Sequence, residues 1–195
     1  MSLDGIRVIG LDLMGTLLYD PYREALLAAT GRQPEELVAL RTPGVWETFE
    51  LGRIDEETYA ERFFTRESGV RFDVATFRHH MALGYRFLPG MKKLLEELAA
   101  LRPVHVLSNY PVWYEDLRQR FELDLHVSGH QVSYVLGARK PAREFYERSL
   151  AAIGCEASEL LFVDDRAENV SAADTLGMRA IVFDSADALR TQLSL

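Results

Sequence analysis

An acidic side chain stands directly after the first apolar run of the sequence. Asp12 follows residues 6–11 in the stretch VIGLDLMGTLLYD, and Gly15 and Thr16 come shortly after it. Glycine permits a tight backbone turn and threonine adds a hydroxyl, so the stretch suits a reactive carboxylate at a strand end as well as a simple turn cap. A reactive carboxylate in such a place often has a second carboxylate two residues later, where this chain has Met14. The stretch therefore raises the question of an enzyme that lacks one of its usual groups.

Two further polar sites lie at the starts of predicted helices. Ser108 and Asn109 follow the apolar run 104–107. Asn109 suits a helix cap, but free backbone N–H groups beside a hydroxyl also make an anion site. Lys140 precedes Pro141 at another helix start, where the helix dipole disfavours a cation by roughly 0.3–1 kcal/mol at an exposed site. Lys140 is misplaced unless an anion lies nearby; a solvated lysine is the alternative.

A pair of adjacent carboxylates follows the apolar run 160–163. Asp164 and Asp165 stand there together, and Asn169 comes four residues after Asp165. Two such carboxylates at a strand end repel each other, and a divalent cation relieves that repulsion. Oxygen donors with few dedicated ligands suit Mg²⁺ better than a transition metal. The pair predicts a magnesium site, with a double turn cap as the alternative.

The elements that must position these groups alternate along the chain. Short apolar runs that are typical of buried strands occupy residues 6–11, 104–107, 160–163 and 180–183, with a weaker candidate at 125–128. Helical patterns occupy residues 91–101, 112–121, 142–153 and 169–176. This alternation predicts an α/β fold with a doubly wound, Rossmann-like parallel sheet and helices on both faces. Ligands of such sheets bind beyond the carboxyl ends of the strands, where the polar sites are expected to meet.

The segment 20–86 has a different pattern from the rest of the chain. It shows helical periodicity without a convincing strand. We predict a small helical cap at 20–86, inserted into an α/β core formed by residues 1–19 and 87–195. An insertion after the first strand would lie over the strand ends like a lid.

Side chains of the predicted cap fall into two groups. Arg41, Glu47 and Arg53 are candidates for facing a substrate. The aromatic residues recur at helical spacing and are expected to form the core of the cap: Trp46, Phe49, Tyr59, Phe63 and Phe64.

The four polar sites together resemble a known family. D-L-M-G-T, S-N, K-P and F-V-D-D-R-A-E-N look like the four successive motifs of the haloacid dehalogenase-like hydrolase superfamily. The likeness spans the whole chain, including LPGMKKLLEELAAL and SAADTLGMRAIVF, and the insertion resembles that superfamily's small helical cap. Within the superfamily the chain is most similar to bacterial sugar-phosphate phosphatases such as α-D-glucose-1-phosphate phosphatase.

The resemblance implies a Mg²⁺-dependent phosphatase of a small phosphorylated metabolite, with an aspartyl-phosphate at Asp12. The residues that it implies as metal ligands are Asp12, Met14 through its backbone carbonyl, Asp165, and Asp164 through water, with support from Asn169. The residues that it implies as catalytic are Asp12, Ser108 and Lys140, and those that it implies in substrate binding are Thr16, Ser108, Asn109 and Lys140. Phosphoryl transfer depends on positioning and charge neutralisation, which such groups supply.

Met14 departs from the family pattern. Most phosphatases of the superfamily carry Asp at this position, where it protonates the leaving alcohol and later deprotonates the attacking water. A thioether can do neither, and general acid–base help is typically worth about 10²–10⁴-fold in rate. Metal binding through the backbone carbonyl needs no side chain and would survive. The absence of a carboxyl at Met14 is therefore expected to slow turnover and not to prevent metal binding.

Three alternatives to a phosphatase follow from this departure. Haloacid dehalogenases work without Mg²⁺ and lack the acidic pair, which this chain retains as Asp164 and Asp165. Phosphonate-cleaving members form a Schiff base with a cap lysine, and residues 20–86 contain no lysine. A catalytically retired module that binds a phosphorylated metabolite is the third alternative. The retained Asp12 argues against it, because nothing but attack specifically requires that carboxylate.

Bulk properties limit the partners and the compartment. The chain has 195 residues and a net charge of −8, which disfavours binding to nucleic acid or to an anionic membrane. Cys155 is the single cysteine, so no internal disulfide can form and a reducing compartment is the simplest interpretation. No apolar stretch reaches the roughly 18 residues of a membrane span. We expect a cytoplasmic monomer or homodimer whose partner is a small phosphorylated metabolite.

Overall fold

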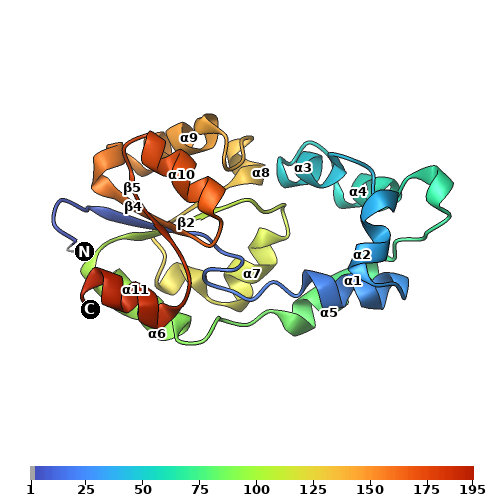
Figure 1. Ribbon diagram of the computed structural model, residues 1–195, viewed down its shortest axis with the longest axis horizontal. Coiled ribbons are helices and arrows are strands. Elements are labelled where there is room, and N and C mark those ends of the chain that lie inside the picture. Colours follow the sequence, from blue (N-terminus) through green and yellow to red (C-terminus); the bar gives the residue numbers. More distant parts are fainter. Residues whose placement is uncertain (1–2) are drawn as a thin grey trace.

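The computed structural model describes residues 3–195, which contain a five-stranded parallel sheet flanked by helices (Figure 1). The strands are β1 (Val8–Leu11), β2 (Val104–Ser108), β3 (Gly129–Val132), β4 (Leu160–Asp164) and β5 (Arg179–Val182). Their order in the sheet is β3-β2-β1-β4-β5, and every neighbouring pair is parallel. The predicted doubly wound α/β fold is confirmed. Residues 1 and 2 of the predicted core lie outside the described residues.

Side chains of the central strands alternate between two hydrophobic cores, as the period of two of a strand requires. Val8 of β1 and Phe162 of β4 pack on the side of α9 (Arg143–Ile153) and α10 (Ala167–Thr175). Ile9 and Val163, their neighbours along these strands, belong to the other core, with α6 (Met91–Leu101) and α11 (Ala186–Leu193). Figure 1 shows these two helix pairs on opposite sides of the sheet. Because both faces are covered, the strands are apolar on both sides.

The helices of the core follow the predicted patterns closely. The pattern at 91–101 is α6, and α7 (Tyr114–Arg120) falls within the pattern at 112–121. The helix α9 ends before Gly154, whose left-handed backbone (φ 75°) closes it as a C-cap. A short helix, α8 (Ser133–Leu136), follows β3, and 3₁₀ turns occupy Leu123–Leu125 and Ala157–Glu159. No helix formed by residues 3–195 is long and apolar enough to cross a membrane.

The weak strand candidate at 125–128 is wrong. The third strand along the chain is instead β3 (Gly129–Val132), which pairs with residues 105–108 of β2. Leu125 ends a 3₁₀ turn and is 71% exposed, so its apolar side chain is not part of a core. Because β3 lies at the edge of the sheet, its sequence GHQV carries polar residues, and an apolar run does not mark it.

The segment between β1 and α6 is helical and lies at one end of the molecule in Figure 1. Its helices are α1 (Tyr22–Thr30), α2 (Pro34–Leu37), α3 (Val45–Glu50), α4 (Glu56–Arg62) and α5 (Val74–Gly84), with 3₁₀ turns at Val38–Leu40 and Arg66–Ser68. The aromatic core expected here is present. Phe49, Tyr59 and Phe63 are buried, and the rings of Phe49 and Tyr59 stack with centroids 4.5 Å apart. The limits of a separate cap at 20–86 stay a prediction.

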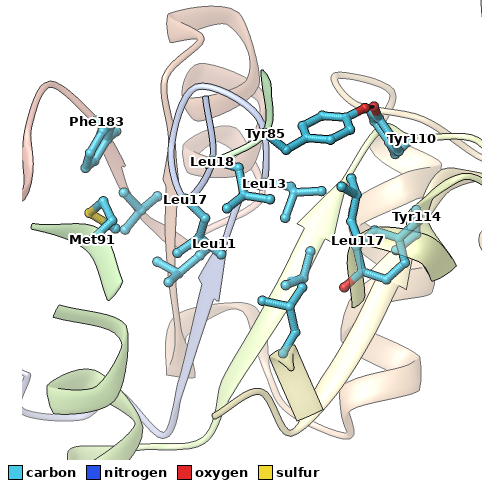
Figure 2. Packing of buried hydrophobic residues seen from close by; sticks show 14 of the residues in the cluster. Leu11, Leu13, Leu17, Leu18, Tyr85, Met91, Tyr110, Tyr114, Leu117 and Phe183 are labelled. Carbon is cyan, nitrogen blue, oxygen red and sulfur yellow. Dashed lines mark hydrogen bonds between the residues drawn. The ribbon is translucent and has the colours of Figure 1, made fainter. Parts of the chain in front are cut away.

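Apolar anchors fix the loop that leaves β1. Leu13, Leu17 and Leu18 are fully buried beneath it, as Figure 2 shows. At the same end of the sheet, the hydroxyls of Tyr85 and Tyr110 hydrogen-bond to each other and join the end of α5 to the loop after β2 (Figure 2). The hydrophobic core therefore fixes the loop after β1, and this loop lies beside the helical segment.

Candidate active site

Asp12 is the first polar residue after β1. Its backbone N–H donates to the carbonyl of Val163 (2.9 Å), which extends the pairing between β1 and β4 by one residue. The side chain is 10% exposed and lines a cleft of about 470 Å³ at the carboxyl ends of the strands. The turn that follows requires Gly15, whose φ of +80° is a conformation that other residues rarely adopt. The sheet therefore fixes the carboxylate rigidly and leaves it open to the cleft.

Lys140 reaches across the sheet to Asp12. Its ammonium donates to Asp12 Oδ1 (2.7 Å), to Asp164 Oδ2 (2.6 Å) and to the carbonyl of Leu107 (2.7 Å), and its side chain is 2% exposed. The side-chain amide of Asn109 forms two hydrogen bonds with the backbone of Lys140. The amide oxygen accepts from the N–H of Lys140 (2.8 Å), and the amide nitrogen donates to the carbonyl of Lys140 (2.9 Å). The lysine that appeared misplaced at a helix start thus has two buried anions as partners.

Asp164 is fully buried, and both of its carboxylate oxygens are occupied. Oδ1 accepts from the backbone N–H of Arg166 (2.9 Å) and from Nδ2 of Asn169 (2.9 Å). Oδ2 accepts from Lys140 (2.6 Å) and more weakly from the same amide of Asn169 (3.1 Å). Asp164 therefore orients the lysine and the turn that follows β4.

Asp165 is exposed in the cleft, unlike its neighbour. A Cβ atom on Gly15 would approach Asp165 Oδ2 to 2.5 Å, so the absence of a side chain at Gly15 gives this carboxylate its space. Carboxylate oxygens of Asp12, Asp164 and Asp165 lie within 4.8 Å of one another. Three carboxylates around one ammonium leave an excess of negative charge, and all the donors are oxygen. This arrangement fits a hard divalent cation such as Mg²⁺.

The burial of the site and the charges within it shift the pKa values of its ionisable groups. Burial raises the pKa of Asp12 to about 7; the negative charge of Asp164 adds to the rise, and Lys140 opposes it. Burial disfavours the charge of Lys140, but its two carboxylate partners outweigh burial and raise the pKa of the ammonium. Desolvation, followed by repulsion from Asp164, raises the pKa of Asp165. Perturbed groups gathered in one cleft are typical of a reactive centre.

The remaining predicted site residues divide into two kinds. Ser108 ends β2, is 1% exposed and lines the cleft, as do Met14 and Asn109. Asn109 uses its side chain on Lys140, so its own contact with a phosphate would come from the backbone and stays a prediction. Thr16 is fully buried, is not among the residues that line the cleft, and its hydroxyl has no partner within residues 3–195. Its position does not support the predicted contact with substrate, because the turn at Gly15 directs the threonine into the core.

Several residues of the cleft were not predicted from the sequence. Arg139 Nη2 pairs with the buried carboxylate of Glu50 at the end of α3 (2.9 Å), and both residues line the cleft. Tyr110, Asp20 and Arg166 line it as well. Arg139 and Tyr110 adjoin predicted motifs, Arg166 lies within one, and Asp20 is the first residue of the predicted cap. These positions are the only sequence signal that could have found them. Glu50 has no such signal, because its place depends on how the helical segment packs.

A first prediction concerns the buried cation. Lys140→Met keeps the length of the side chain but leaves Asp12 and Asp164 without a counter-charge, which we expect to lower the free energy of unfolding by about 3–5 kcal/mol. Lys140 lowers the pKa of Asp12, so its removal raises the pKa of this carboxyl above the value of about 7 in the wild type. Stability linked to a raised carboxyl pKa is lost as pH rises through that pKa, so the variant continues to lose stability above pH 7, where the wild type no longer does. The deficit should therefore be larger near pH 8 than near pH 5.5. Urea unfolding at both pH values measures it.

The matched control for this substitution is Lys92→Met, at an exposed lysine of α6. It should change stability by less than about 0.5 kcal/mol at either pH. A Lys140→Met protein as stable as the control at pH 8 would contradict a structural role for the buried ion pairs.

Comparison with known protein families gives one match over most of the chain. The family model for haloacid dehalogenase-like hydrolases matches residues 6–177. Flavin mononucleotide hydrolase 1 of Arabidopsis thaliana, described as a chloroplast protein, is 36% identical over 190 residues, which cover 97% of this chain and 77% of that protein. A sesquiterpene phosphatase of Aspergillus oryzae is 34% identical over 154 residues, which cover 77% of this chain and 76% of that protein.

Comparison with solved structures shows the same fold. A haloacid dehalogenase family enzyme from Bacteroides thetaiotaomicron superimposes with a TM-score of 0.81 at 18% identity, covering 96% of this chain and 98% of that one. The same enzyme, in a complex with magnesium and inorganic phosphate, gives a TM-score of 0.77 at 19% identity, with 93% and 96% covered.

Proposed function

The chain belongs to the haloacid dehalogenase-like hydrolases and is a phosphomonoesterase, and we propose that it cleaves small phosphorylated metabolites through an aspartyl-phosphate at Asp12. The observation that carries this proposal is the Asp12–Lys140–Asp164 arrangement, in which a carboxylate that lines the cleft contacts a buried ammonium 128 residues away in the sequence. Asp12 follows β1 and Asp164 ends the neighbouring β4, while Lys140 lies between α8 and α9, where Asn109 holds its backbone.

In the proposed reaction a carboxylate oxygen of Asp12 forms a bond to phosphorus as the ester P–O bond breaks. The alkoxide that leaves takes up a proton from water, because Met14 offers none. Water then attacks phosphorus and passes its proton to solvent, which releases inorganic phosphate and restores the carboxylate. Lys140 places a fixed positive charge beside Asp12, where phosphoryl oxygens gather negative charge. Ser108 and the backbone N–H of Asn109 are proposed to hold the phosphoryl oxygens.

The acidic cluster fits Mg²⁺ as the cofactor. The residues that would hold the ion are Asp12, Asp165 and the backbone carbonyl of Met14, while Asp164 is occupied by hydrogen bonds and is proposed to act through water. When bound, Mg²⁺ neutralises charge on the phosphoryl group. Asn169 holds Asp164, so its predicted support of the metal is indirect.

We propose flavin mononucleotide as the first substrate to test, because the Arabidopsis relative of that name is 36% identical over 97% of this chain. Sugar phosphates, and a place near α-D-glucose-1-phosphate phosphatase, stay predictions, as do a cytoplasmic location and a monomeric or homodimeric state. A panel of phosphate esters with Mg²⁺, including flavin mononucleotide and glucose 1-phosphate, tests the proposal. Release of inorganic phosphate from a member of the panel supports it, and no release from any ester favours the non-catalytic binding module.

A second prediction concerns the metal. Activity should disappear in excess chelator and return with Mg²⁺. Asp165→Ala should weaken the apparent affinity for Mg²⁺ by more than the roughly 10–100-fold that loss of an outer-shell partner costs. Because Asp165 is exposed, the melting temperature of this variant in the absence of metal should stay close to that of the wild type.

Two comparisons sharpen the metal test. Asp164→Ala should lower the melting temperature clearly, since it removes a buried partner of Lys140 and Asn169, and should affect Mg²⁺ affinity less than Asp165→Ala does. Asp174→Ala changes an exposed carboxylate of α10 and serves as the control. Undiminished activity in excess chelator would exclude the metal assignment.

A further inference from the structure

A second cavity adjoins the catalytic cleft within the helical segment. It has a volume of about 420 Å³ and shares Asp20, Trp46 and Glu47 with the cleft, so the two spaces meet at these residues. We call it the cap cavity. Its position means that a molecule with its phosphate beside Asp12 can extend past Asp20 and Glu47 into it.

The cap cavity is lined largely by aromatic rings. Tyr22, Trp46, Tyr59 and Phe63 line it, and the centroid of the Tyr59 ring lies 5.7 Å from that of Trp46 and 5.4 Å from that of Phe63. Rings at such separations attract one another and accept a further flat ring by stacking or by edge contact. Three of the five aromatic residues expected to form the core of the cap, Trp46, Tyr59 and Phe63, therefore also form a wall of this cavity.

Two buried polar atoms in this wall lack partners. Nε of Arg41 and the hydroxyl of Tyr59 are shielded from solvent and have no hydrogen-bond partner anywhere in residues 3–195. The guanidinium of Arg41 instead lies over two rings, 5.3 Å from the centroid of Tyr22 and 5.9 Å from that of Phe63. Both Arg41 and Tyr59 line the cap cavity. Buried donors without partners are costly, and a ligand that brings acceptors removes that cost.

We infer that the cap cavity binds the leaving group of the substrate, as a flat aromatic ring system with carbonyl acceptors toward Arg41 and Tyr59. The acidic side chains of Asp20 and Glu47, at the junction of the two spaces, are suited to accept hydrogen bonds from hydroxyl groups of the chain that joins ring and phosphate. Glu47 and Asp20 carry negative charge, so this junction disfavours a second anion. This inference rests on the proposed function and adds how the substrate is recognised.

The test compares an ester that carries such a ring with one that does not. Flavin mononucleotide and acetyl phosphate are assayed with the wild type, Arg41→Ala and Tyr59→Phe. The ratio of kcat/KM for the flavin ester to that for acetyl phosphate should fall about 10–100-fold in Arg41→Ala and about 2–10-fold in Tyr59→Phe, mainly through KM. The control is Arg62→Ala, at an exposed arginine of α4 that lines neither space, for which the ratio should not change.

Two measurements that do not depend on catalysis complete the test. Riboflavin has the ring and the hydroxylated chain of flavin mononucleotide but no phosphate. Its fluorescence should be quenched when it binds the wild type, and it should bind Arg41→Ala at least about tenfold more weakly. The melting temperature of ligand-free Tyr59→Phe should not fall, since the hydroxyl that it removes has no partner. A fall in melting temperature would show that this hydroxyl serves the fold and would contradict its assignment to ligand binding.

The outcomes separate this inference from the proposed function. If the wild type hydrolyses flavin mononucleotide and the ratio is unchanged in Arg41→Ala, the inference is wrong and the function stands. If the wild type hydrolyses neither ester, the proposed function fails, and riboflavin binding to the wild type and to Arg41→Ala alone decides the inference. Absence of riboflavin binding in that case overturns it.

Discussion

Asp12→Asn is expected to lower turnover of every phosphate ester by about 10⁴–10⁶-fold, the range found when single members of a catalytic triad are removed from an enzyme. The amide keeps the size of the side chain and an oxygen that can accept from Lys140, whose ammonium lies 2.7 Å from Oδ1 of Asp12. It removes the negative charge that attacks phosphorus. Binding of phosphate should therefore persist while covalent chemistry stops.

The fold should survive this change. Burial raises the pKa of Asp12 to about 7, so the charged carboxylate is disfavoured in the folded protein and the neutral amide is not. A carboxyl with a raised pKa contributes less to stability as pH rises through that value, and Asn lacks this dependence. At pH 8 the variant should unfold at a temperature no lower than the wild type, with Asp164 still paired to Lys140.

Single-turnover assays with a phosphate ester, together with thermal unfolding at pH 6 and pH 8, check both expectations. Mass spectrometry of the variant excludes deamidation back to Asp. In the wild type, acid quenching during turnover should trap one phosphoryl group on the peptide that contains Asp12, and none in the variant. An active Asp12→Asn protein that retains its amide would rule out covalent catalysis through this residue.

Met14→Asp is expected to accelerate hydrolysis of ordinary alkyl phosphates by at most about 10²–10⁴-fold. Met14 lines the cleft that also contains Asp12 and Asp165, so a carboxyl at this position faces the reacting groups. The wild type has no acid at Met14 to protonate the leaving oxygen. Aryl and acyl phosphates, whose leaving groups need little protonation, should therefore be its better substrates, and their gain in the variant should be smaller.

Ethyl phosphate and phenyl phosphate form the substrate pair for this test, with Asp12→Asn as the blank. Asp20 lines the cleft as well and is the carboxyl to examine beside Met14. If the wild type hydrolyses both esters equally fast and Met14→Asp changes nothing, the proton comes from another residue. Asp20→Asn should then slow ethyl phosphate more than phenyl phosphate if Asp20 is that residue. If no protein of the series hydrolyses either ester, the non-catalytic module becomes the better account.

Most of the sheet could be predicted from local pattern. The apolar runs that became β1, β2 and β4 lie in the middle of the sheet, and burial on both faces leaves a continuous apolar signature. The run that became β5 is also apolar, although β5 lies at an edge and Val182 is 45% exposed. The edge strand β3 has no such signature and was placed four residues too early. The predicted strand ends also located Asp12, Ser108 and Asp164, because parallel strands bring their carboxyl ends to one edge of the sheet.

The chemical types of the site residues were also readable from the sequence. An oxygen-rich cluster and a lysine without a local reason for its position both pointed to an anionic substrate and a hard metal ion. The tertiary structure decided which of these groups touch. Lys140 pairs with Asp12 and Asp164, and Asn109 turns its side chain to the backbone of that lysine. Such contacts join residues far apart in the chain, and no local periodicity encodes them.

The helical segment 20–86, the predicted cap, shows the same limit most clearly. The sequence by itself determined that residues 20–86 form helices with aromatic side chains at helical spacing. It could not separate rings that only fill a core from rings that also line a cavity, because both kinds have the same spacing. Tyr59 acquires a candidate role, and the predicted role of Arg41 gains support, only where packing between helices leaves their polar atoms without partners beside the catalytic cleft. That outcome depends on the volumes of many side chains from different helices, which only the tertiary structure combines.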